Sequence, residues 1–362
     1  MNTTQAARLL QQFIPDATCM EVIPVGSGNI NDTFYIKAQT SPNAMQHLIL
    51  QRLNHHVFRE PERVMDNWVQ VTTHLAAQPH YPYAIPVPLN TVRKKWLHKD
   101  EAGNFWRMFP FFENTETPEG RADVYVAQEA ARAYGAFARA LQAFPAKNLA
   151  ETLVGFHDTE QRWKVFEEVL QADVAGRVRQ IQEEIGRLCA TRSVTHQIAA
   201  LKASGDLPLR VTHNDTKAGN VLLHRDTKKA VAVIDLDTVM PGTLLSDFGD
   251  MVRTFVPSTP EDAKERPQIR GDIYEALENA YLEETGGFLA AGERAYLPLG
   301  GLWMCAEQAL RFLSDYAAGD VYYKIRSADH NLVRARNQLS VFESLFEYFV
   351  SVKKEPCVAH LK

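Results

Sequence analysis

The stretch from Leu209 to Arg253 reads LRVTHNDTKAGNVLLHRDTKKAVAVIDLDTVMPGTLLSDFGDMVR and decides the fold of this 362-residue chain. Two apolar runs of strand character lie within it, Val221–Leu223 and Ala230–Ile234. Each run lies beside a cluster of polar residues. The pattern predicts two short strands that carry polar side chains at their ends.

The first polar cluster holds Asp215, Lys217 and Asn220 at offsets 0, +2 and +5. Kinase catalytic loops carry an Asp base, a Lys that meets the transferred phosphoryl group and an Asn metal ligand at these offsets. Asp235 ends the second apolar run fifteen residues past Asn220, where a kinase places its metal carboxylate. His213 is expected to hold the loop backbone.

These residue types suit phosphoryl transfer from ATP to a hydroxyl group. A carboxylate such as Asp215 can orient a hydroxyl and accept its proton late in the transfer. Asn220 and Asp235 offer the oxygen ligands that Mg²⁺ prefers, and Lys217 can offset charge on the moving phosphoryl group. A single Asp or Asn in a turn is more often a turn former, so the prediction depends on the joint spacing.

A second tripeptide, Asp247-Phe248-Gly249, has the sequence of the kinase metal motif but lies too far from Asn220. It also opens a helical pattern, so we expect Asp247 to be structural and to bond catalytic-loop amides from below. Asp235 keeps the metal role, with Asp237 as a candidate partner.

Taken together, these motifs resemble the aminoglycoside phosphotransferase and choline kinase family, which shares the protein-kinase fold. Within it the chain most resembles the bacterial N-acetylhexosamine 1-kinases, and the likeness covers nearly the whole chain. The resemblance rests on the central stretch and on GSGNINDTFY (26–35), LQRLN (50–54), FHDT (156–159), RFLSDY (311–316) and NLVR (331–334). It implies an α+β, bilobal protein-kinase-like fold, with a small antiparallel-sheet lobe at residues 1–112 and a larger, mostly helical lobe at 113–362.

The composition fits a globular protein with two sizeable lobes. Hydrophobic residues make up 45% of the chain, and the formal net charge of −5 gives no reason to expect nucleic-acid or membrane partners. The four cysteines have no metal-ligand spacing, and neither a signal peptide nor a membrane-spanning run is recognisable. We expect a soluble cytoplasmic protein; its oligomeric state is left open.

In the small lobe, Met20–Val25 and Thr33–Lys37 are predicted strands around a glycine-bearing turn. The resemblance makes this turn a nucleotide loop, with Gly26, Ser27, Gly28 and Asn29 as cofactor-binding residues. The third strand, His47–Leu53, lacks the phosphate-pairing Lys of protein kinases and offers Gln51 and Arg52 instead. A helix over Glu60–Leu75 should follow, with neither Glu60 nor Glu62 assigned as a partner. The segments Tyr83–Val92, Trp96–His98 and Asn104–Phe112 are predicted to complete the sheet.

Between the lobes, the backbone of about Phe111 to Glu113 is expected to read the adenine edge. In the large lobe, helical periodicity predicts helices whose bounds are Tyr125–Phe144, Gln161–Ile185, Val194–Ala203, Ile269–Glu284, Glu293–Tyr316 and Leu332–Val350.

The late helices normally wall the acceptor site in this fold, which makes Arg311 and Tyr322 substrate candidates. The alternative is that Arg311 pairs with Asp315 and that the tyrosines belong to the core. The mixed charges of this region argue against aminoglycosides, while rings of Trp303, Tyr316 and Tyr322 leave a choline cage open.

The sequence thus predicts a Mg²⁺- and ATP-dependent kinase, and the resemblance implies N-acetylglucosamine or N-acetylgalactosamine as acceptor and the sugar 1-phosphate as product. One alternative is a kinase of another small alcohol, such as homoserine, choline, another hexose or an aminoglycoside. A second alternative is an inactive nucleotide-binding module, for which the missing third-strand Lys is the only support.

Overall fold

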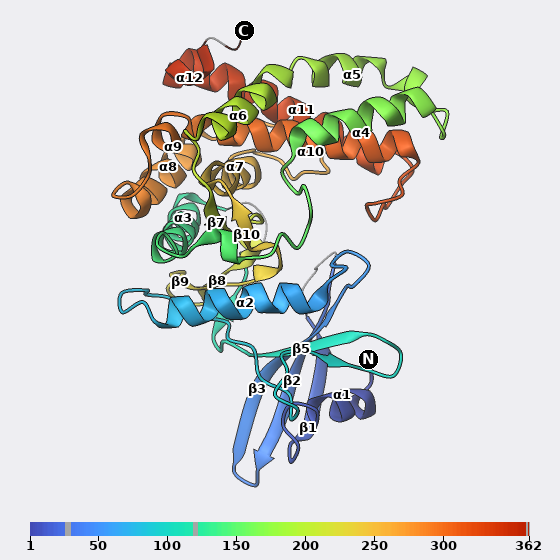
Figure 1. The fold of residues 1–362 in the computed structure, drawn as a ribbon, viewed down its shortest axis with the longest axis vertical. Coiled ribbons are helices and arrows are strands. Elements are labelled where there is room, and N and C mark those ends of the chain that lie inside the picture. The colour runs from blue at the N-terminus through green and yellow to red at the C-terminus, as the bar shows by residue number, and fades with distance from the viewer. Residues whose placement is uncertain (26–29, 119–121, 360, 362) are drawn as a thin grey trace.

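The computed structural model describes the whole chain except residues 26–29, 119–121, 360 and 362. Two lobes are evident, with the small lobe at the bottom of Figure 1 and the large, mostly helical lobe at the top. The prediction of a bilobal α+β fold with a small antiparallel-sheet lobe is confirmed. None of the helices in the described ranges is long and apolar enough to cross a membrane.

An antiparallel sheet of five strands in the order β1-β2-β3-β5-β4 forms the small lobe. The strand bounds are β1 (Thr18–Pro24), β2 (Asp32–Ser41), β3 (Ala44–Leu53), β4 (His98–Lys99) and β5 (Phe105–Pro110). Side chains alternate between the two faces of a strand, so each face receives its own helix. Helix α1 (Thr3–Leu10) covers one face, where Leu9 and Leu10 join a cluster with Ile36 and Leu50. Helix α2 (Pro61–Ala76) covers the other face, where Trp68 stacks on Phe109.

The predicted strand over Tyr83–Val92 is wrong. This segment forms a single parallel bridge, between Ala84 and Ala232, and no named strand. Its residues Pro86 and Pro88 have no amide proton to donate to a ladder, so a continuous strand cannot form there.

Two small sheets of the large lobe, with five short strands between them, bring the polar clusters together. Strand β7 (Arg210–Thr212) pairs with β10 (Met240–Gly242), and β8 (Val221–His224) pairs with both β6 (Thr115–Glu116) and β9 (Ala230–Val233). The loop 213–220 therefore joins two adjacent strand pairs. The proposed lobe boundary after Phe112 falls between β5 of the small lobe and β6 of the large lobe, and we retain it as a proposal.

The large lobe is built from helices that surround these strands. Its α-helices are α3 (Val124–Ala140), α4 (Thr159–Ala172), α5 (Gln182–Cys189), α6 (Arg192–Ser204), α7 (Leu244–Phe255), α8 (Gly271–Thr285), α9 (Ala291–Ala295), α10 (Leu297–Ala318), α11 (His330–Tyr348) and α12 (Pro356–Ala359). Short helical turns are η1 (Ala146–Asn148), η2 (Val178–Gln180), η3 (Ala218–Asn220), η4 (Leu236–Thr238) and the π-helical η5 (Phe349–Lys353).

The single helix predicted over Gln161–Ile185 is instead two helices, α4 and α5. Asp173 adopts a left-handed conformation with φ of 37° directly after α4, and Gly176 follows with φ of 64°. A left-handed residue ends a helix because the chain leaves the helical path there. The predicted helix Glu293–Tyr316 is likewise divided at Tyr296 into α9 and α10, and Pro298 lies in the first turn of α10.

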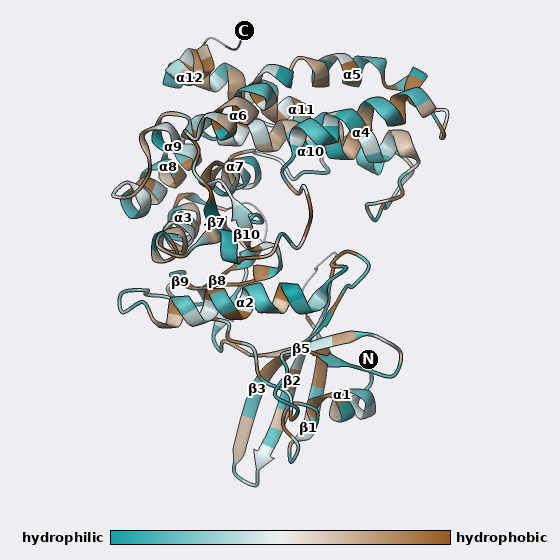
Figure 2. Cartoon of the chain, in the orientation of Figure 1, coloured by the Kyte–Doolittle hydropathy of each residue, from teal (hydrophilic) through white to brown (hydrophobic). Residues whose placement is uncertain are grey.

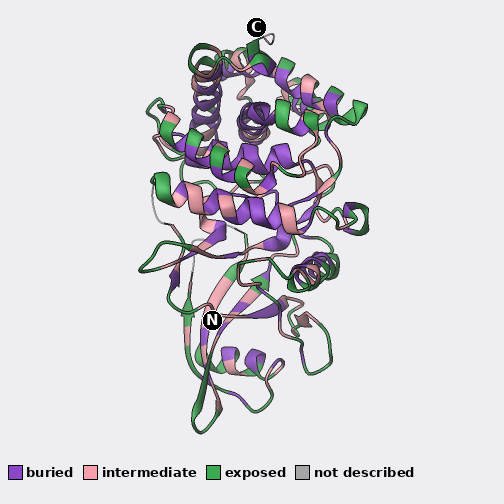
Figure 3. Ribbon diagram, turned by 90° about the vertical axis from the view of Figure 1, so that its left-hand side faces the viewer, coloured by how far each residue is buried: buried purple, intermediate pink, exposed green. Residues whose placement is uncertain are grey.

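Helix α7 occupies the centre of the large lobe, and all but one of its residues are buried. It crosses α10 closely, because Gly249 of α7 and Gly300 of α10 face each other without side chains between them. Figure 3 shows the buried residues in purple, concentrated in the helices of the large lobe. By contrast, α2 mixes hydrophilic and hydrophobic residues along its length in Figure 2, as a helix with one buried face should.

The glycine contact predicts opposite effects for two Gly→Ala substitutions. A Cβ on Gly249 would lie 2.1 Å from the Gly300 carbonyl oxygen, whereas a Cβ on Gly186 in α5 would meet nothing within 4 Å. Gly249→Ala should lower the free energy of unfolding by about 3 kcal/mol through overpacking. The control Gly186→Ala should raise it by up to about 1 kcal/mol, since alanine favours the helix. Urea unfolding measures both, and equal stability of the two variants would contradict the contact.

Candidate active site

The loop between β7 and β8 is fixed from below by Asp247 of α7. Its Oδ2 accepts a hydrogen bond from the His213 amide at 2.8 Å, and its Oδ1 accepts one from the Asn214 amide at 2.7 Å. The hydroxyl of Thr216 donates to the backbone carbonyl of Asp247 at 2.6 Å. The structural role predicted for Asp247 is therefore confirmed.

His213 is fully buried and holds the loop backbone, as predicted. Its Nε2 lies 3.0 Å from the Ile234 carbonyl, and its Nδ1 accepts from the Asp215 amide at 3.3 Å. Burial lowers the pKa of this imidazole, which favours the neutral form. The following Asn214 has a φ of 64°, a left-handed conformation that turns the chain sharply into Asp215.

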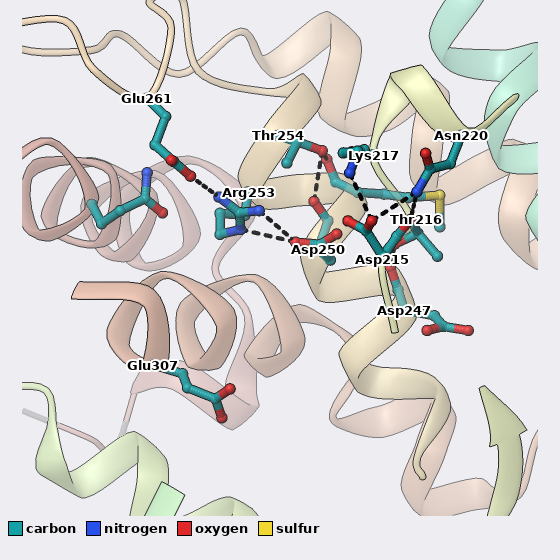
Figure 4. A network of polar contacts seen from close by, with 12 residues as sticks. Asp215, Thr216, Lys217, Asn220, Asp247, Asp250, Arg253, Thr254, Glu261 and Glu307 are labelled. Carbon is teal, nitrogen blue, oxygen red and sulfur yellow. Dashed lines mark hydrogen bonds and ion pairs between the residues drawn. The ribbon is translucent and has the colours of Figure 1, made fainter. Parts of the chain in front are cut away.

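The three residues singled out by spacing meet in space, as Figure 4 shows. One carboxylate oxygen of Asp215, Oδ2, accepts from Lys217 Nζ at 2.7 Å and from Asn220 Nδ2 at 2.8 Å. Burial alone would raise the pKa of Asp215, but the charge and hydrogen bond of Lys217 hold it below its ordinary value. Because the amide nitrogen of Asn220 points to Asp215, its carbonyl oxygen Oδ1 is left as a possible ligand.

Asp235 follows β9 and has a strained left-handed backbone with φ of 61°. Within the described ranges its carboxylate has no hydrogen-bonding partner. Burial, together with the neighbouring carboxylates of Asp237 and Asp215, raises its pKa to about 7. A half-buried carboxylate whose charge is uncompensated fits a cation, and the oxygens of Asp235 and Asn220 are the donor set that Mg²⁺ prefers.

Asp237 is not available as a second metal ligand. Both of its carboxylate oxygens are bound by Arg107, at 2.5 and 2.9 Å, and Oδ2 also accepts from Asn31 at 2.7 Å. The expectation that Asp237 joins Asp235 at the metal is therefore wrong. Its sequence position gives no hint of the partner, which lies 130 residues away.

On the nucleotide side, the predicted loop residues Gly26, Ser27, Gly28 and Asn29 lie outside the described residues. The predicted hinge follows β5, where the Phe111 amide already donates to the His47 carbonyl at 2.9 Å. Glu113 is exposed and lies 3.9 Å from His47. The nucleotide-binding roles of Phe111 and Glu113 stay predictions.

The third strand places its two candidates on opposite sides of the sheet. Arg52 is exposed and pairs with Asp32, so it does not point into the site. Gln51 points inward, where its amide bonds Thr33 and Arg107. Neither takes the place of the kinase lysine by itself.

A chain of charged side chains borders the Asp215 centre on the side of the late helices (Figure 4). Arg253 of α7 bonds Asp250 at 2.9 Å and Glu261 at 2.7 Å, and Glu261 also accepts from Arg334 of α11. The Oδ2 atom of Asp250 is buried and has no hydrogen-bonding partner among the residues that the structure describes. The carboxylate of Asp250 also helps to raise the pKa of Lys217, after Asp215 and Asp235.

Of the two predicted acceptor residues, Arg311 is the better placed. Its guanidinium lies 5.2 Å from the Phe156 ring centroid and 5.7 Å from that of Tyr323, and in the described ranges it has no hydrogen-bonding partner. The alternative pairing with Asp315 is wrong, since Asp315 caps the amides of Tyr322 and Tyr323. Tyr322 itself is 61% exposed.

A buried carboxylate, Glu307 of α10, holds the FHDT segment in place. It accepts from His157 Nδ1 at 2.8 Å and from the Thr159 hydroxyl at 2.7 Å, and the Trp303 indole donates to Thr159. Burial would raise the pKa of Glu307, but His157, Arg162 and Arg311 lower it to about 2. The wall beside Arg311 is thereby fixed.

A cavity of about 660 Å³ opens on the Asn214 side of the loop 213–220. His157, Lys202 and Trp303 line it, whereas Asp215, Arg311 and Tyr322 do not. The predicted acceptor residues therefore lie outside this cavity.

Five charged residues near the site were not predicted from the sequence: Asp250, Arg253, Glu261, Glu307 and Arg107. Each forms an ion pair within the protein. Arg107, Glu307 and Glu261 pair with residues that are distant in the chain, whereas Asp250 and Arg253 are neighbours on α7. Asp250 and Arg253 lie one turn apart on a helix that is mostly apolar after Asp247, and this spacing is the local signal that could have indicated them.

Comparison with known proteins identifies a matching family and similar folds. Residues 21–295 match the phosphotransferase enzyme family. A microcompartment-associated aminopropanol kinase has a similar structure, with a TM-score of 0.63, 18% sequence identity, and coverage of 97% of this chain and 98% of that one.

Two further solved structures are similar at low sequence identity. An amicoumacin kinase, in complex with AMP-PNP, Ca²⁺ and Ami, gives a TM-score of 0.63 at 14% identity, with 95% and 94% of the chains covered. The choline kinase of Cryptosporidium parvum Iowa II gives 0.61 at 14% identity, with 99% of each chain covered. At these identities the likeness shows the fold.

The lowered pKa of Glu307 predicts a pH-dependent contribution to stability. The ionised carboxylate stabilises the fold above its ordinary pKa of 4.5, and this contribution is lost as the pH falls from about 4.5 to about 2. Glu307→Gln should therefore lower the free energy of unfolding at pH 7 by about 3 kcal/mol, and by much less at pH 3.

Denaturant titrations at both pH values measure this difference. Glu168→Gln, on the exposed side of α4, is the control and should have little effect at either pH. A Glu307→Gln deficit that is the same at pH 7 and pH 3 would show that the charge of Glu307 is not what stabilises the segment.

Proposed function

The chain belongs to the phosphotransferase enzyme family, and from this premise we propose that it is an ATP-dependent kinase of N-acetylhexosamines. It transfers a phosphoryl group to the anomeric hydroxyl and yields the sugar 1-phosphate. The coarser function, a small-molecule phosphotransferase of the aminoglycoside phosphotransferase and choline kinase type, follows from the family and the fold. The acceptor is the part that needs testing.

The observation that carries the proposal is the arrangement of the Asp215 centre. One loop supplies a carboxylate, an ammonium group and an amide in mutual hydrogen-bond contact. Asp235, whose carboxylate has no hydrogen-bonding partner in the described part of the chain, follows the adjacent strand, and its pKa is raised to about 7 by burial and by Asp237 and Asp215. A purely structural cluster would compensate this carboxylate, so its free state supports a cation-dependent activity.

In the proposed reaction, Asp215 orients the acceptor hydroxyl and takes its proton as the bond to phosphorus forms. Its lowered pKa makes it a weak base, which suits a proton transfer that comes late. Lys217 remains an ammonium group, because Asp215, Asp235 and Asp250 outweigh the effect of burial on its pKa, and it offsets charge on the transferred group.

Asn220 and Asp235 are the residues that would hold Mg²⁺, which when bound neutralises charge on the ATP phosphates. In the similar amicoumacin kinase the bound species are AMP-PNP and Ca²⁺, which supports a nucleotide with a divalent cation here. The nucleotide would lie between the Gly26–Asn29 loop and the Phe111–Glu113 segment.

The charges of the predicted acceptor wall favour a neutral acceptor with hydroxyl and carbonyl oxygens. Arg311 offers hydrogen-bond donors, while Glu261 and Glu307 are already bound to protein cations or donors. A polycationic aminoglycoside would need free carboxylates at this wall. Tyr322 is retained as a candidate sugar contact next to Arg311.

The rings of Trp303, Tyr316 and Tyr322, which were candidates for a choline cage, do not form one together. Trp303 is buried and faces Lys202 Nζ at 4.2 Å, and Tyr316 is buried and faces Arg177 at 4.5 Å. Two of the three rings therefore already face protein cations, which argues against choline as the acceptor.

ADP release with Mg²⁺-ATP tests the acceptor directly. N-acetylglucosamine, N-acetylgalactosamine, galactose, choline, homoserine and kanamycin form the panel. Preferential turnover of the two N-acetylhexosamines, with a product that resists reducing-end labelling, is expected. Preference for another acceptor would overturn the sugar assignment and keep the kinase, whereas nucleotide binding without turnover on an extended panel would favour an inactive module.

Substitution of Asp215 tests its catalytic role. Asp215→Asn keeps the shape of the side chain but cannot accept the proton, so turnover should fall by roughly a hundred- to ten-thousand-fold. Binding of a fluorescent ATP analogue should hardly change, because the variant keeps Asn220 and Asp235. Asp66→Asn, on the exposed side of α2, serves as the control. Near-normal turnover of Asp215→Asn would remove it as the base.

A further inference from the structure

In protein kinases a lysine of the third strand pairs with a glutamate of the following helix, and this ion pair must form for activity. Neither partner is present here. The third strand β3 contains no lysine, and α2 faces the sheet with apolar residues, among them Met65 and Trp68. Glu60 is exposed and pairs with Arg63.

A different cation occupies the space beneath α2. Arg107 of β5 lies opposite Gln51 in the register of β3 and β5, and its side chain is fully buried. Its guanidinium lies 4.6 Å from the ring centroid of Trp68. The charge therefore reaches the interior from the neighbouring strand.

All five N–H groups of Arg107 have acceptors within the protein. Nε and one Nη2 proton donate to Gln51 Oε1, at 2.9 and 2.6 Å. The other Nη2 proton and one Nη1 proton donate to the two oxygens of Asp237, and Nη1 also approaches Met65 Sδ at 3.6 Å. No donor is left for a phosphate, so Arg107 does not act by touching the nucleotide.

The partner, Asp237, belongs to the large lobe and lies two residues after Asp235. It is 3% exposed, and it also accepts from Asn31 Nδ2 at 2.7 Å. Asn31 lies just past the predicted nucleotide loop, and its Oδ1 accepts from the Asn54 amide at the end of β3. One carboxylate thus connects β5, the end of the nucleotide loop and the segment that carries Asp235.

From this geometry we infer that Arg107 is a positioning residue whose ion pair with Asp237 aligns the small lobe with the metal-binding segment. The inference rests on the proposed function. The pair replaces the lysine–glutamate pair of protein kinases, but it connects the sheet to the Asp235 segment instead of to α2. It fixes Asn31 on one side and the left-handed backbone of Asp235 on the other.

Removal of one partner alone would leave an uncompensated buried charge and could unfold the protein. The test therefore uses the double variant Arg107→Met with Asp237→Leu, in which both charges are replaced by apolar groups. Arg187→Met with Glu343→Leu is the matched control. It removes a two-bond arginine–carboxylate pair between α5 and α11, at the far end of the large lobe in Figure 1.

Two readouts separate positioning from simple stability. The first is hydrogen exchange at the Asn54 amide, which reports whether Asn31 is held and needs no nucleotide. The second is Mg²⁺-dependent binding of a fluorescent ATP analogue, which needs no acceptor. In the double variant we expect exchange at Asn54 to accelerate, and nucleotide affinity in Mg²⁺ to fall, each by about tenfold or more. The control pair should change neither.

Unchanged exchange and unchanged affinity in a folded double variant would overturn the inference. If the double variant does not fold, Arg107→Lys gives the decision, because it keeps the charge and loses the two-pronged contact with Asp237. Faster exchange at Asn54 in this variant supports the inference, and wild-type exchange overturns it. Wild-type protein that binds no nucleotide would refute the proposed function, while the exchange measurement would still test the ion pair.

Discussion

The hydrogen bonds from the amides of His213 and Asn214 to the buried Asp247 carboxylate are the contact on which the site depends. They connect the loop 213–220 to α7, a helix of the large lobe in which all but one residue is buried. Because α7 packs closely against α10, the loop is anchored to the packed core of the large lobe. Asp215 and Lys217 can then meet Asn220 of η3 although neither lies in a helix or strand.

The contacts within the proposed catalytic centre could be predicted because its parts are close in sequence. Asp215, Lys217 and Asn220 belong to the loop before β8, and Asp235 follows β9, the second strand of the β8–β9 hairpin, so local spacing determines which side chains meet. The contacts that support this centre are different in kind. Arg107 lies 130 residues from Asp237, and His157 lies 150 residues from Glu307. Whether such pairs form depends on the register of the strands and on the rotation of the helices. The sequence FWRMFP around Arg107 does not show whether its arginine is buried or exposed.

The errors in secondary structure also have physical causes. The segment Tyr83–Val92 is apolar enough for a strand, yet Pro86 and Pro88 deny it a hydrogen-bond ladder, and this was readable in the sequence. The break between α4 and α5 was less readable, because Asp173 adopts its left-handed conformation without being a glycine. Helical periodicity on either side of a short turn then looks like one long helix.

The position of Arg107 bears on how such an enzyme can be regulated. Protein kinases switch off when the helix after the third strand swings outward, because that movement breaks the lysine–glutamate pair. Here the same helix, α2, contributes an aromatic face and a thioether to Arg107 and no acidic partner. An outward swing of α2 would leave the Arg107–Asp237 pair in place. The alignment of the sheet with the Asp235 segment therefore does not depend on an acidic side chain from this helix.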